Sequence, residues 1–349
     1  MPPKPALLER YRDLLARPGE TFALSLGEGG TPLIHAQRLG AELGLDRLYL
    51  KFEGANPTGS FKDRGMVLTV HRAMAAGARA VICASTGNTS ASAAAYAAAA
   101  GIPCFVVLPA GKVARGKLAQ AVAAGARLIG VEGNFDVALA AVREIGESGD
   151  AVVVNSVNPD RISGQQTGAF EIVDELGAAP DAVALPVGNA GNITAYWAGF
   201  RRYADAGLAR GRPRMLGFQA DGAAPIVRGA PVAAPETVAT AIRIGNPASW
   251  AGAVAARDES GGLIESVSDE AILGMQSRIA RKEGIFCEPA SAAGVAGVAR
   301  LVSEGRVGRS EVVVCVLTGH GLKDPDVVVG EVAATVPAEV AAIREAMRA

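Results

Sequence analysis

The chain of 349 residues carries 34 lysines and arginines against 35 aspartates and glutamates. This balance predicts no general affinity for nucleic acid or for an acidic membrane surface, and no apolar run approaches the length of a membrane span. Only 5% of the residues are aromatic, whereas 43 are glycine. Small residues suit the close packing of helices against sheets, so the composition favours an α/β protein.

Strand-like apolar runs alternate with helical patterns along most of the chain. The strands of a first series are predicted at residues 48–53, 80–84, 104–108, 127–131 and 152–154, and helices at 66–76, 89–100, 114–123 and 135–147. A second series of strands is predicted at residues 182–187, 215–220, 264–267 and 312–317. This alternation predicts open, mostly parallel sheets with helices on both faces. The polar segment 222–247 has weak periodicity, and we expect helices joined by long loops there.

A lysine stands between the first predicted strand and the first predicted helix, in the segment Asn56-Pro57-Thr58-Gly59-Ser60-Phe61-Lys62-Asp63-Arg64-Gly65. At a helix start, the positive end of the helix dipole and a partly apolar site both disfavour an ammonium group. A lysine whose pKa is lowered, so that more of it is a neutral amine, is suited to Schiff-base chemistry. Most lysines at helix starts are simply solvated, so this interpretation of Lys62 needs support from other segments.

Three other small polar loops each follow a predicted strand. They read Ser85-Thr86-Gly87-Asn88-Thr89-Ser90, Pro186-Val187-Gly188-Asn189-Ala190-Gly191-Asn192 and Leu317-Thr318-Gly319-His320-Gly321. Open α/β sheets bind their ligands at the carboxyl ends of strands, so these loops are candidate binding segments.

Two of these loops are suited to anions. In the second loop, consecutive backbone N–H groups at a helix start form an anion-binding cup, made by Gly188, Asn189, Ala190, Gly191 and Asn192. The first loop offers hydroxyls and helix-start N–H groups that suit a substrate carboxylate, at Ser85, Thr86 and Thr89. An ordinary glycine-rich turn and plain helix capping are the alternative interpretations.

With these four segments aligned, the chain resembles the fold-type II enzymes that use pyridoxal 5′-phosphate, and within them the threonine synthases. Cysteine synthases tend to read Asn-Pro-Gly-Gly-Ser-Val-Lys-Asp-Arg where this chain has residues 56–64, and threonine dehydratases lack the Asp-Arg-Gly after Ser-Phe-Lys. The resemblance covers nearly the whole chain. It implies a large lobe of residues 1–54 and 156–349, which contacts the cofactor's phosphate and pyridine nitrogen, and a smaller inserted lobe at about residues 55–155.

The resemblance also implies a role for three residues at the cofactor. Lys62 would hold the cofactor and move protons, while Asn88 would contact the ring hydroxyl. Thr318 would face the pyridine nitrogen, where a neutral hydroxyl supports a less electrophilic ring than an aspartate would. A threonine that caps the end of its strand is the alternative for Thr318.

A second phosphate site, for the substrate, is implied after the strand at 152–154. Asn155, Ser156 and Arg161 resemble the family segment that contacts the substrate phosphate, and a guanidinium supplies a planar fork for phosphate. A solvated loop arginine is the alternative for Arg161.

The expected reaction converts O-phospho-L-homoserine and water to L-threonine and phosphate. The alternatives are a threonine or serine dehydratase of the same fold and a non-catalytic ligand-binding relative. The resemblance implies a homodimer. No apolar stretch like a signal peptide follows Met1, so we expect a cytoplasmic enzyme.

The four cysteines, Cys83, Cys104, Cys287 and Cys315, form no Cys-x-x-Cys pair. We therefore expect buried, reduced thiols and no metal site.

Overall fold

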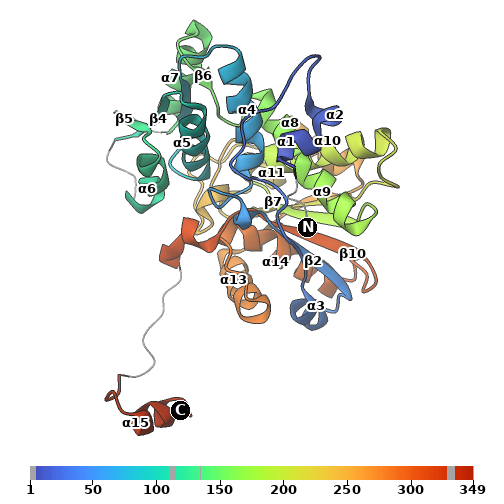
Figure 1. Ribbon diagram of the computed structural model, residues 1–349. Coiled ribbons are helices and arrows are strands. Elements are labelled where there is room, and N and C mark those ends of the chain that lie inside the picture. Colours follow the sequence, from blue (N-terminus) through green and yellow to red (C-terminus); the bar gives the residue numbers. More distant parts are fainter. Residues whose placement is uncertain (1–4, 111–114, 134, 328–334, 349) are drawn as a thin grey trace.

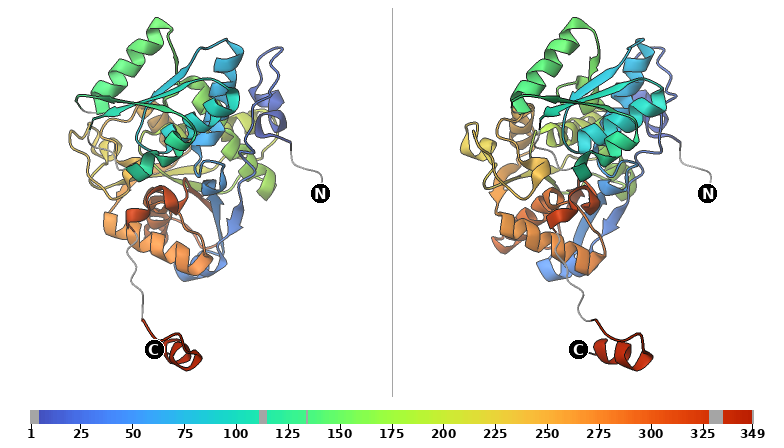
Figure 2. Two further views of the ribbon diagram at one scale, coloured as in Figure 1. Left: turned by 60° about the vertical axis from the view of Figure 1, so that its left-hand side comes forward. Right: turned by 90° about the vertical axis from the view of Figure 1, so that its left-hand side faces the viewer.

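The computed structural model of the chain describes residues 5–110, 115–133, 135–327 and 335–348. Its described strands form two separate sheets, one with six strands and one with four. In Figure 1 the four-stranded sheet and its helices occupy the upper left part of the molecule, and the six-stranded sheet lies below and to the right. Figure 2 shows the same arrangement from two further sides.

The six-stranded sheet is parallel except at one edge, where β1 runs antiparallel to β2. In spatial order its strands are β1 (Leu33–His35), β2 (Arg47–Phe52), β10 (Val312–Leu317), β7 (Ala182–Pro186), β8 (Arg214–Ala220) and β9 (Leu263–Val267). Because β10 and β7 are parallel neighbours, the loops that follow them leave the sheet at the same edge.

Side chains of the central strands alternate between two cores. In β10, Val314 and Val316 belong to one core, and Val313, Cys315 and Leu317 belong to the other. A strand buried on both faces lacks polar residues, as this one does. One face is covered by α9 (Thr167–Leu176), α10 (Gly191–Asp205) and α12 (Trp250–Glu259), and the other by α3 (Gln37–Leu43), α13 (Asp269–Glu283) and α14 (Pro289–Ser303).

The four-stranded sheet is parallel throughout. Its strands, in spatial order, are β5 (Arg127–Val131), β4 (Cys104–Pro109), β3 (Val81–Ala84) and β6 (Val152–Val153). Helix α5 (Asn88–Ala100) packs on one face, beside α4 (Lys62–Ala75) and α6 (Arg115–Ala123), and α7 (Phe135–Ser148) packs on the other.

Short helices and 3-10 turns complete the described chain. They are α1 (Leu7–Arg10), α2 (Arg12–Leu15), η1 (Glu53–Ala55), α8 (Pro159–Gln165), α11 (Pro225–Arg228), η2 (Thr240–Ile242), η3 (Gly321–Lys323), η4 (Pro325–Val327) and α15 (Val340–Ala346). None of the helices within the described residues is both long and apolar enough to cross a membrane.

The predicted fold class is confirmed, since both sheets are mostly parallel and carry helices on their two faces. The expectation of helices joined by long loops between residues 222 and 247 is confirmed only in part. That segment contains one four-residue helix, α11, and the 3-10 turn η2, and otherwise follows an irregular path. Pro225 begins the short helix α11. The later prolines lack a backbone N–H and disfavour a helix, at Pro231, Pro235 and Pro247. The predicted limits of the two lobes, at residues 55 and 155, stay a prediction.

Two glycines allow α4 and α8 to cross closely. A Cβ atom on Gly65 would lie 2.5 Å from the backbone oxygen of Arg161, and one on Gly164 would lie 2.2 Å from the backbone oxygen of Arg64. Neither position leaves room for a side chain, because the obstructing atoms belong to the facing helix backbone. The crossing therefore fixes the first turn of α4, which begins at Lys62.

We predict that Gly164→Ala destabilises the protein. Forcing a methyl group into a packed contact typically costs about 1–3 kcal/mol, so the urea midpoint of unfolding, followed by circular dichroism, should fall. Gly274→Ala is the matched control, because Gly274 lies within α13 with no atom within 4 Å of an added Cβ. It should leave the midpoint unchanged or raise it. A Gly164→Ala midpoint equal to that of the control would contradict the described crossing.

Candidate active site

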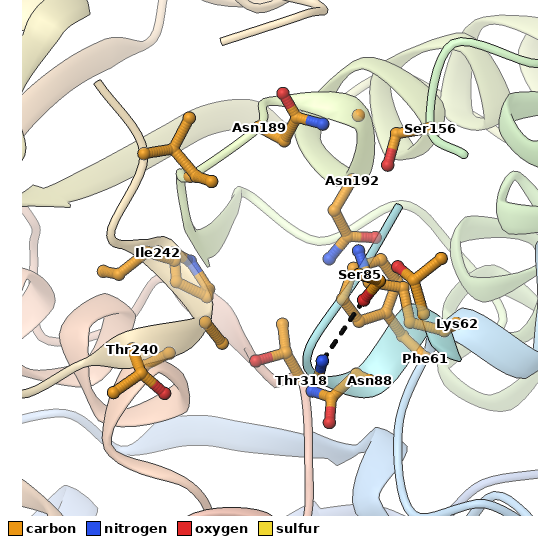
Figure 3. A pocket seen from close by; sticks show the side chains of 18 of the residues that line it. Phe61, Lys62, Ser85, Asn88, Ser156, Asn189, Asn192, Thr240, Ile242 and Thr318 are labelled. Carbon is orange, nitrogen blue, oxygen red and sulfur yellow. Dashed lines mark hydrogen bonds between the residues drawn. The ribbon is translucent and has the colours of Figure 1, made fainter. Parts of the chain in front are cut away.

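A cavity of about 400 Å³ lies where the carboxyl ends of strands from both sheets converge. The loops after β3, β6, β7 and β10 line it, together with the start of α4 and residues 240–244. Figure 3 shows labelled side chains from these segments around one opening. All the predicted site residues except Arg161 line the cavity: Lys62, Ser85, Thr86, Asn88, Thr89, Asn155, Ser156, Gly188, Asn189, Ala190, Gly191, Asn192 and Thr318.

The turn before Lys62 is tied to two helices through Asp63. The Asp63 carboxylate accepts hydrogen bonds from the backbone N–H of Thr58 (2.7 Å), from the Thr58 hydroxyl (2.6 Å) and from the Ser92 hydroxyl on α5 (2.6 Å). These bonds hold the turn against α4 and leave the neighbouring Lys62 side chain facing the cavity.

A buried ion cluster anchors the same helix from behind. The Arg64 guanidinium donates to Glu53 at 2.7 Å and to Glu171 at 2.6 Å, and the Lys51 ammonium lies 3.0 Å from Glu171. All four side chains are fully buried. Removing one partner from such a cluster leaves an unpaired buried charge, so the cluster holds α4, α9 and β2 in a fixed relation.

Lys62 is half-buried at the cavity wall, with its amine beside the Phe61 ring. The amine nitrogen lies 4.3 Å from the centre of that ring. Burial, together with the positive charge of Arg161, lowers the pKa of Lys62 to about 7, while Glu288 acts in the opposite direction. A large fraction of the amine is therefore neutral near physiological pH, as Schiff-base chemistry requires.

The turn after β7 has a constrained backbone. Ala190 adopts a left-handed conformation (φ 64°), which no other non-glycine residue does within the described part of the chain. At Gly188, an added Cβ would lie 2.8 Å from Cα of Ile242, so the absence of a side chain lets residues 240–244 approach the turn. The turn delivers the start of α10 to the cavity, where the first N–H groups of a helix lack intrahelical partners.

The loop after β3 is organised by its first serine. The Ser85 hydroxyl oxygen accepts from the backbone N–H of Gly87 at 3.2 Å and of Ser90 at 3.3 Å. Its hydroxyl proton is not used in either bond. Capping and ligand contact are thus compatible in this loop, and Thr86 and Thr89 line the same wall.

The loop after β6 is fastened to the end of β3. The Asn155 amide accepts from Ala84 N (3.0 Å) and donates to Ala84 O (2.8 Å), which aligns the two loops. Ser156 follows on the cavity wall. This backbone-binding role of Asn155 was not predicted.

Arg161 is not a solvated loop arginine, which was the alternative interpretation of the sequence; it lies on helix α8. Its side chain is fully buried, its Nη1 donates to Val154 O at 2.7 Å, and it is absent from the cavity wall. Its Nε and Nη2 atoms have no hydrogen-bond partner in the described structure. Burial lowers the pKa of Arg161 to about 10. The predicted phosphate contact stays a prediction.

Thr318 lies at the base of the cavity beside a carboxyl group that sequence reasoning missed. Its hydroxyl lies 3.0 Å from Glu288 Oε1 and 3.0 Å from the Ser291 hydroxyl. The other carboxylate oxygen of Glu288 accepts from Asn88 Nδ2 at 2.9 Å. No motif marked Glu288, because it stands alone before the helix Pro289–Ser303.

Other cavity residues also lacked a sequence signal. They are Gln165 on α8, Lys323 on η3 and the segment 240–244. Lys323, in the segment after β10, donates through its ammonium to Thr58 O in the turn before α4 at 3.0 Å and to the side chain of Gln120 on α6.

The cysteines are buried and unpaired with one another, as expected. His320 serves as a structural hydrogen-bond partner, accepting from Leu322 N at 3.1 Å. Within the described ranges, no group of three or more histidine, cysteine, aspartate or glutamate residues is placed to hold a metal ion.

Comparison with known proteins gives a consistent result. The profile of the pyridoxal-phosphate dependent enzyme family matches residues 24–319. The chain is 57% identical to the threonine synthase of Halalkalibacterium halodurans, over 92% of this chain and 90% of that protein. It is 56% identical to the threonine synthase of Mycobacterium tuberculosis, over 97% of this chain and 94% of that protein. The crystal structure of a T.th. threonine deaminase is similar, with a TM-score of 0.70, 26% identity and coverage of 83% of this chain and 92% of that one.

We predict that Lys62 reacts as a neutral amine at unusually low pH. In cofactor-free protein, acetylation of Lys62 by acetic anhydride, followed by peptide mass spectrometry, should rise through a midpoint near pH 7 and then level off. Free Nα-acetyl-lysine should show its midpoint above about pH 10. Because Arg161 contributes to the lowered pKa, Arg161→Met should move the Lys62 midpoint upward. A Lys62 midpoint equal to that of the free amino acid would show that the half-buried cavity wall and Arg161 do not lower the pKa of this amine.

Proposed function

Since the chain belongs to the family of pyridoxal-phosphate dependent enzymes, and among them to the threonine synthases, we propose that it converts O-phospho-L-homoserine and water to L-threonine and phosphate. The observation that carries the proposal is the convergence on one cavity of the Lys62 amine, the start of α10 and the loops at 85–89 and 155–156. An amine and several groups suited to anions are what a phosphorylated amino acid and a phosphorylated cofactor require.

The residues present fit pyridoxal phosphate. Asn192 is 7% exposed and lines the cavity, yet neither the oxygen nor the nitrogen of its side-chain amide has a hydrogen-bond partner within the described chain. Unpaired buried amides of this kind are available to a ligand. We propose that Gly188–Asn192 hold the phosphate, that Lys62 holds the cofactor covalently, and that Asn88 and Thr318 contact the ring.

When bound, the cofactor supplies an electron sink that stabilises negative charge next to the substrate amine. The chain's own part is to orient the substrate and move protons. Once the substrate amine takes its place, the neutral Lys62 amine would accept the proton from Cα and one from Cβ as phosphate leaves the γ-carbon, and would return protons to the γ-carbon, which becomes the methyl group, and finally to Cα. Water then adds at Cβ. Ser85, Thr86 and Thr89 are placed to hold the α-carboxylate during these transfers.

We propose that Arg161 assists recognition of the substrate phosphate. Its unpartnered Nε and Nη2 atoms are donors not used by the protein, and its neighbour Ile162 lines the cavity. Ser156 and Asn155 lie on the same wall. A contact would require the guanidinium to turn toward the cavity or the substrate to reach behind this wall.

A product assay on the cofactor-loaded protein tests the proposal. With O-phospho-L-homoserine, phosphate and L-threonine should appear in equal amounts. A dehydratase would instead release a keto acid and ammonia from L-threonine or L-serine. Keto acid release without any turnover of the phosphorylated substrate would overturn the proposal.

The Arg161→Ala variant should discriminate between substrates. A hydrogen bond to a charged group is worth about 1.5–3 kcal/mol, so kcat/KM for O-phospho-L-homoserine should fall by at least about tenfold. Cofactor affinity should change little, and slow deamination of threonine should fall only by the part of the loss that the raised pKa of Lys62 causes. Arg309→Ala, on the exposed surface, is the control and should leave all three quantities unchanged. Equal losses for phosphorylated and unphosphorylated substrates would show that Arg161 acts through the fold or through the pKa of Lys62 and not on the substrate phosphate.

We further propose that the enzyme works in the cytoplasm as a homodimer, with O-phospho-L-homoserine as its small-molecule partner and with the lobe limits given above. The resemblance to the family supports each of these statements, and light scattering of the purified protein tests the dimer.

A further inference from the structure

Glu288 is a buried carboxyl group that joins the two residues proposed to contact the cofactor ring. It is 2% exposed and lines the base of the cavity. One of its oxygens accepts from Asn88 Nδ2 (2.9 Å), and the other lies 3.0 Å from the Thr318 hydroxyl. The proposed reaction assigns no role to this carboxyl group. A buried charge is nevertheless costly unless it is paired or hydrogen-bonded.

The Thr318 hydroxyl has a single proton, and the neighbouring groups restrict where it can point. Ser291 Oγ lies 3.0 Å from Thr318 Oγ1 and accepts from the backbone N–H of Gly319 at 3.1 Å. Its own proton therefore has Thr318 Oγ1 as a close acceptor, since Gly319 O is at 3.4 Å. With Ser291 donating, Thr318 can donate either to Glu288 or into the cavity, but not to both.

The charge on Glu288 decides between these two directions. An ionised carboxylate only accepts, so Thr318 donates to it and presents a lone pair to the cavity. A protonated Glu288 can donate to Thr318, which leaves the threonine proton free to point into the cavity.

We propose that Glu288 is a positioning residue that sets the direction of the Thr318 hydrogen bond, and thereby whether the ring nitrogen of the bound cofactor carries a proton. The proposal rests on the proposed placement of that nitrogen at Thr318. Ionised Glu288 matches a protonated nitrogen, and protonated Glu288 matches an unprotonated one. The two arrangements contain the same number of protons: as Glu288 gives its proton to Thr318 Oγ1, Thr318 gives its own to the ring.

The surroundings act on the Glu288 proton in opposite directions. Burial raises its pKa above the ordinary value, while the hydrogen bonds from Asn88 and Thr318 and the positive charges of Lys323 and Lys62 act in the opposite direction. Cys287, the adjacent titratable group, has its pKa raised by burial to about 12 and stays a neutral thiol. The pKa of Glu288 thus depends on the charge of Lys62, and that charge changes when the Lys62 amine holds the cofactor.

The test is the nitrogen NMR signal of protein loaded with cofactor labelled with a nitrogen isotope at the ring, because protonation moves this signal strongly upfield. The variant is Glu288→Gln, in which the amide oxygen can still accept from Asn88 while the amide nitrogen donates to Thr318. Its melting temperature should match that of the wild type, and its cofactor affinity should stay within about twofold, since every hydrogen bond is replaced.

In the structure Thr318 Oγ1 donates to Glu288 Oε1, the arrangement of an ionised carboxylate, so in the wild type the ring nitrogen should carry the proton. In Glu288→Gln, Thr318 has only the ring nitrogen to donate to, so the signal should lie downfield of the wild-type signal throughout pH 6 to 9. Thr318→Val should also remove the effect of Glu288 on the ring nitrogen signal, because it deletes the hydroxyl that connects the carboxyl group to that nitrogen. A signal identical to wild type in both variants, with cofactor bound, would overturn the inference. Failure of the phosphohomoserine assay with these shifts intact would instead count against the proposed function alone.

Discussion

The desolvation of the Lys62 amine is the constraint on which the rest of the structure depends. An ammonium group in water would not react with an aldehyde near neutral pH, whereas a buried one gives up its proton more readily. Burial and the nearby Arg161 charge supply this effect, and both follow from the position of α4. That position is fixed by Asp63 within the preceding turn and by the ion cluster around Arg64. Two buried polar networks thus serve the placement of one side chain.

Each of the two sheets contributes the loops at the carboxyl ends of its strands to the cavity. The smaller sheet brings the loops at 85–89 and 155–156 to the cavity, and the larger brings the α10 start and Thr318. Parallel strands direct their carboxyl ends to one edge, so each sheet contributes two loops without any long connection across the site. Lys323 bonds to both the turn before Lys62 and Gln120 on α6, which gives the two halves a direct contact at the cavity.

Strand-end loops were predictable because their signal is local. Lys62, Gly188–Asn192 and Thr318 each follow an apolar run and carry the turn and helix-start chemistry of a ligand site, and the structure places all of them on one cavity. Glu288 and the segment 240–244 lack such a signal, because their position depends on packing between distant segments. For Arg161, the sequence indicated a polar loop but not its burial, which arises from the α4–α8 crossing at Gly65 and Gly164.

Borohydride reduction of the cofactor-loaded protein, followed by peptide mapping, tests the central claim most directly, because it fixes the bound cofactor to the amine that holds it. We predict a single reduced adduct, on Lys62, which is lost when that residue is replaced by alanine. An adduct on any other lysine, for example Lys323 on the same cavity wall, would contradict the assignment of the reactive amine and the role given to its burial.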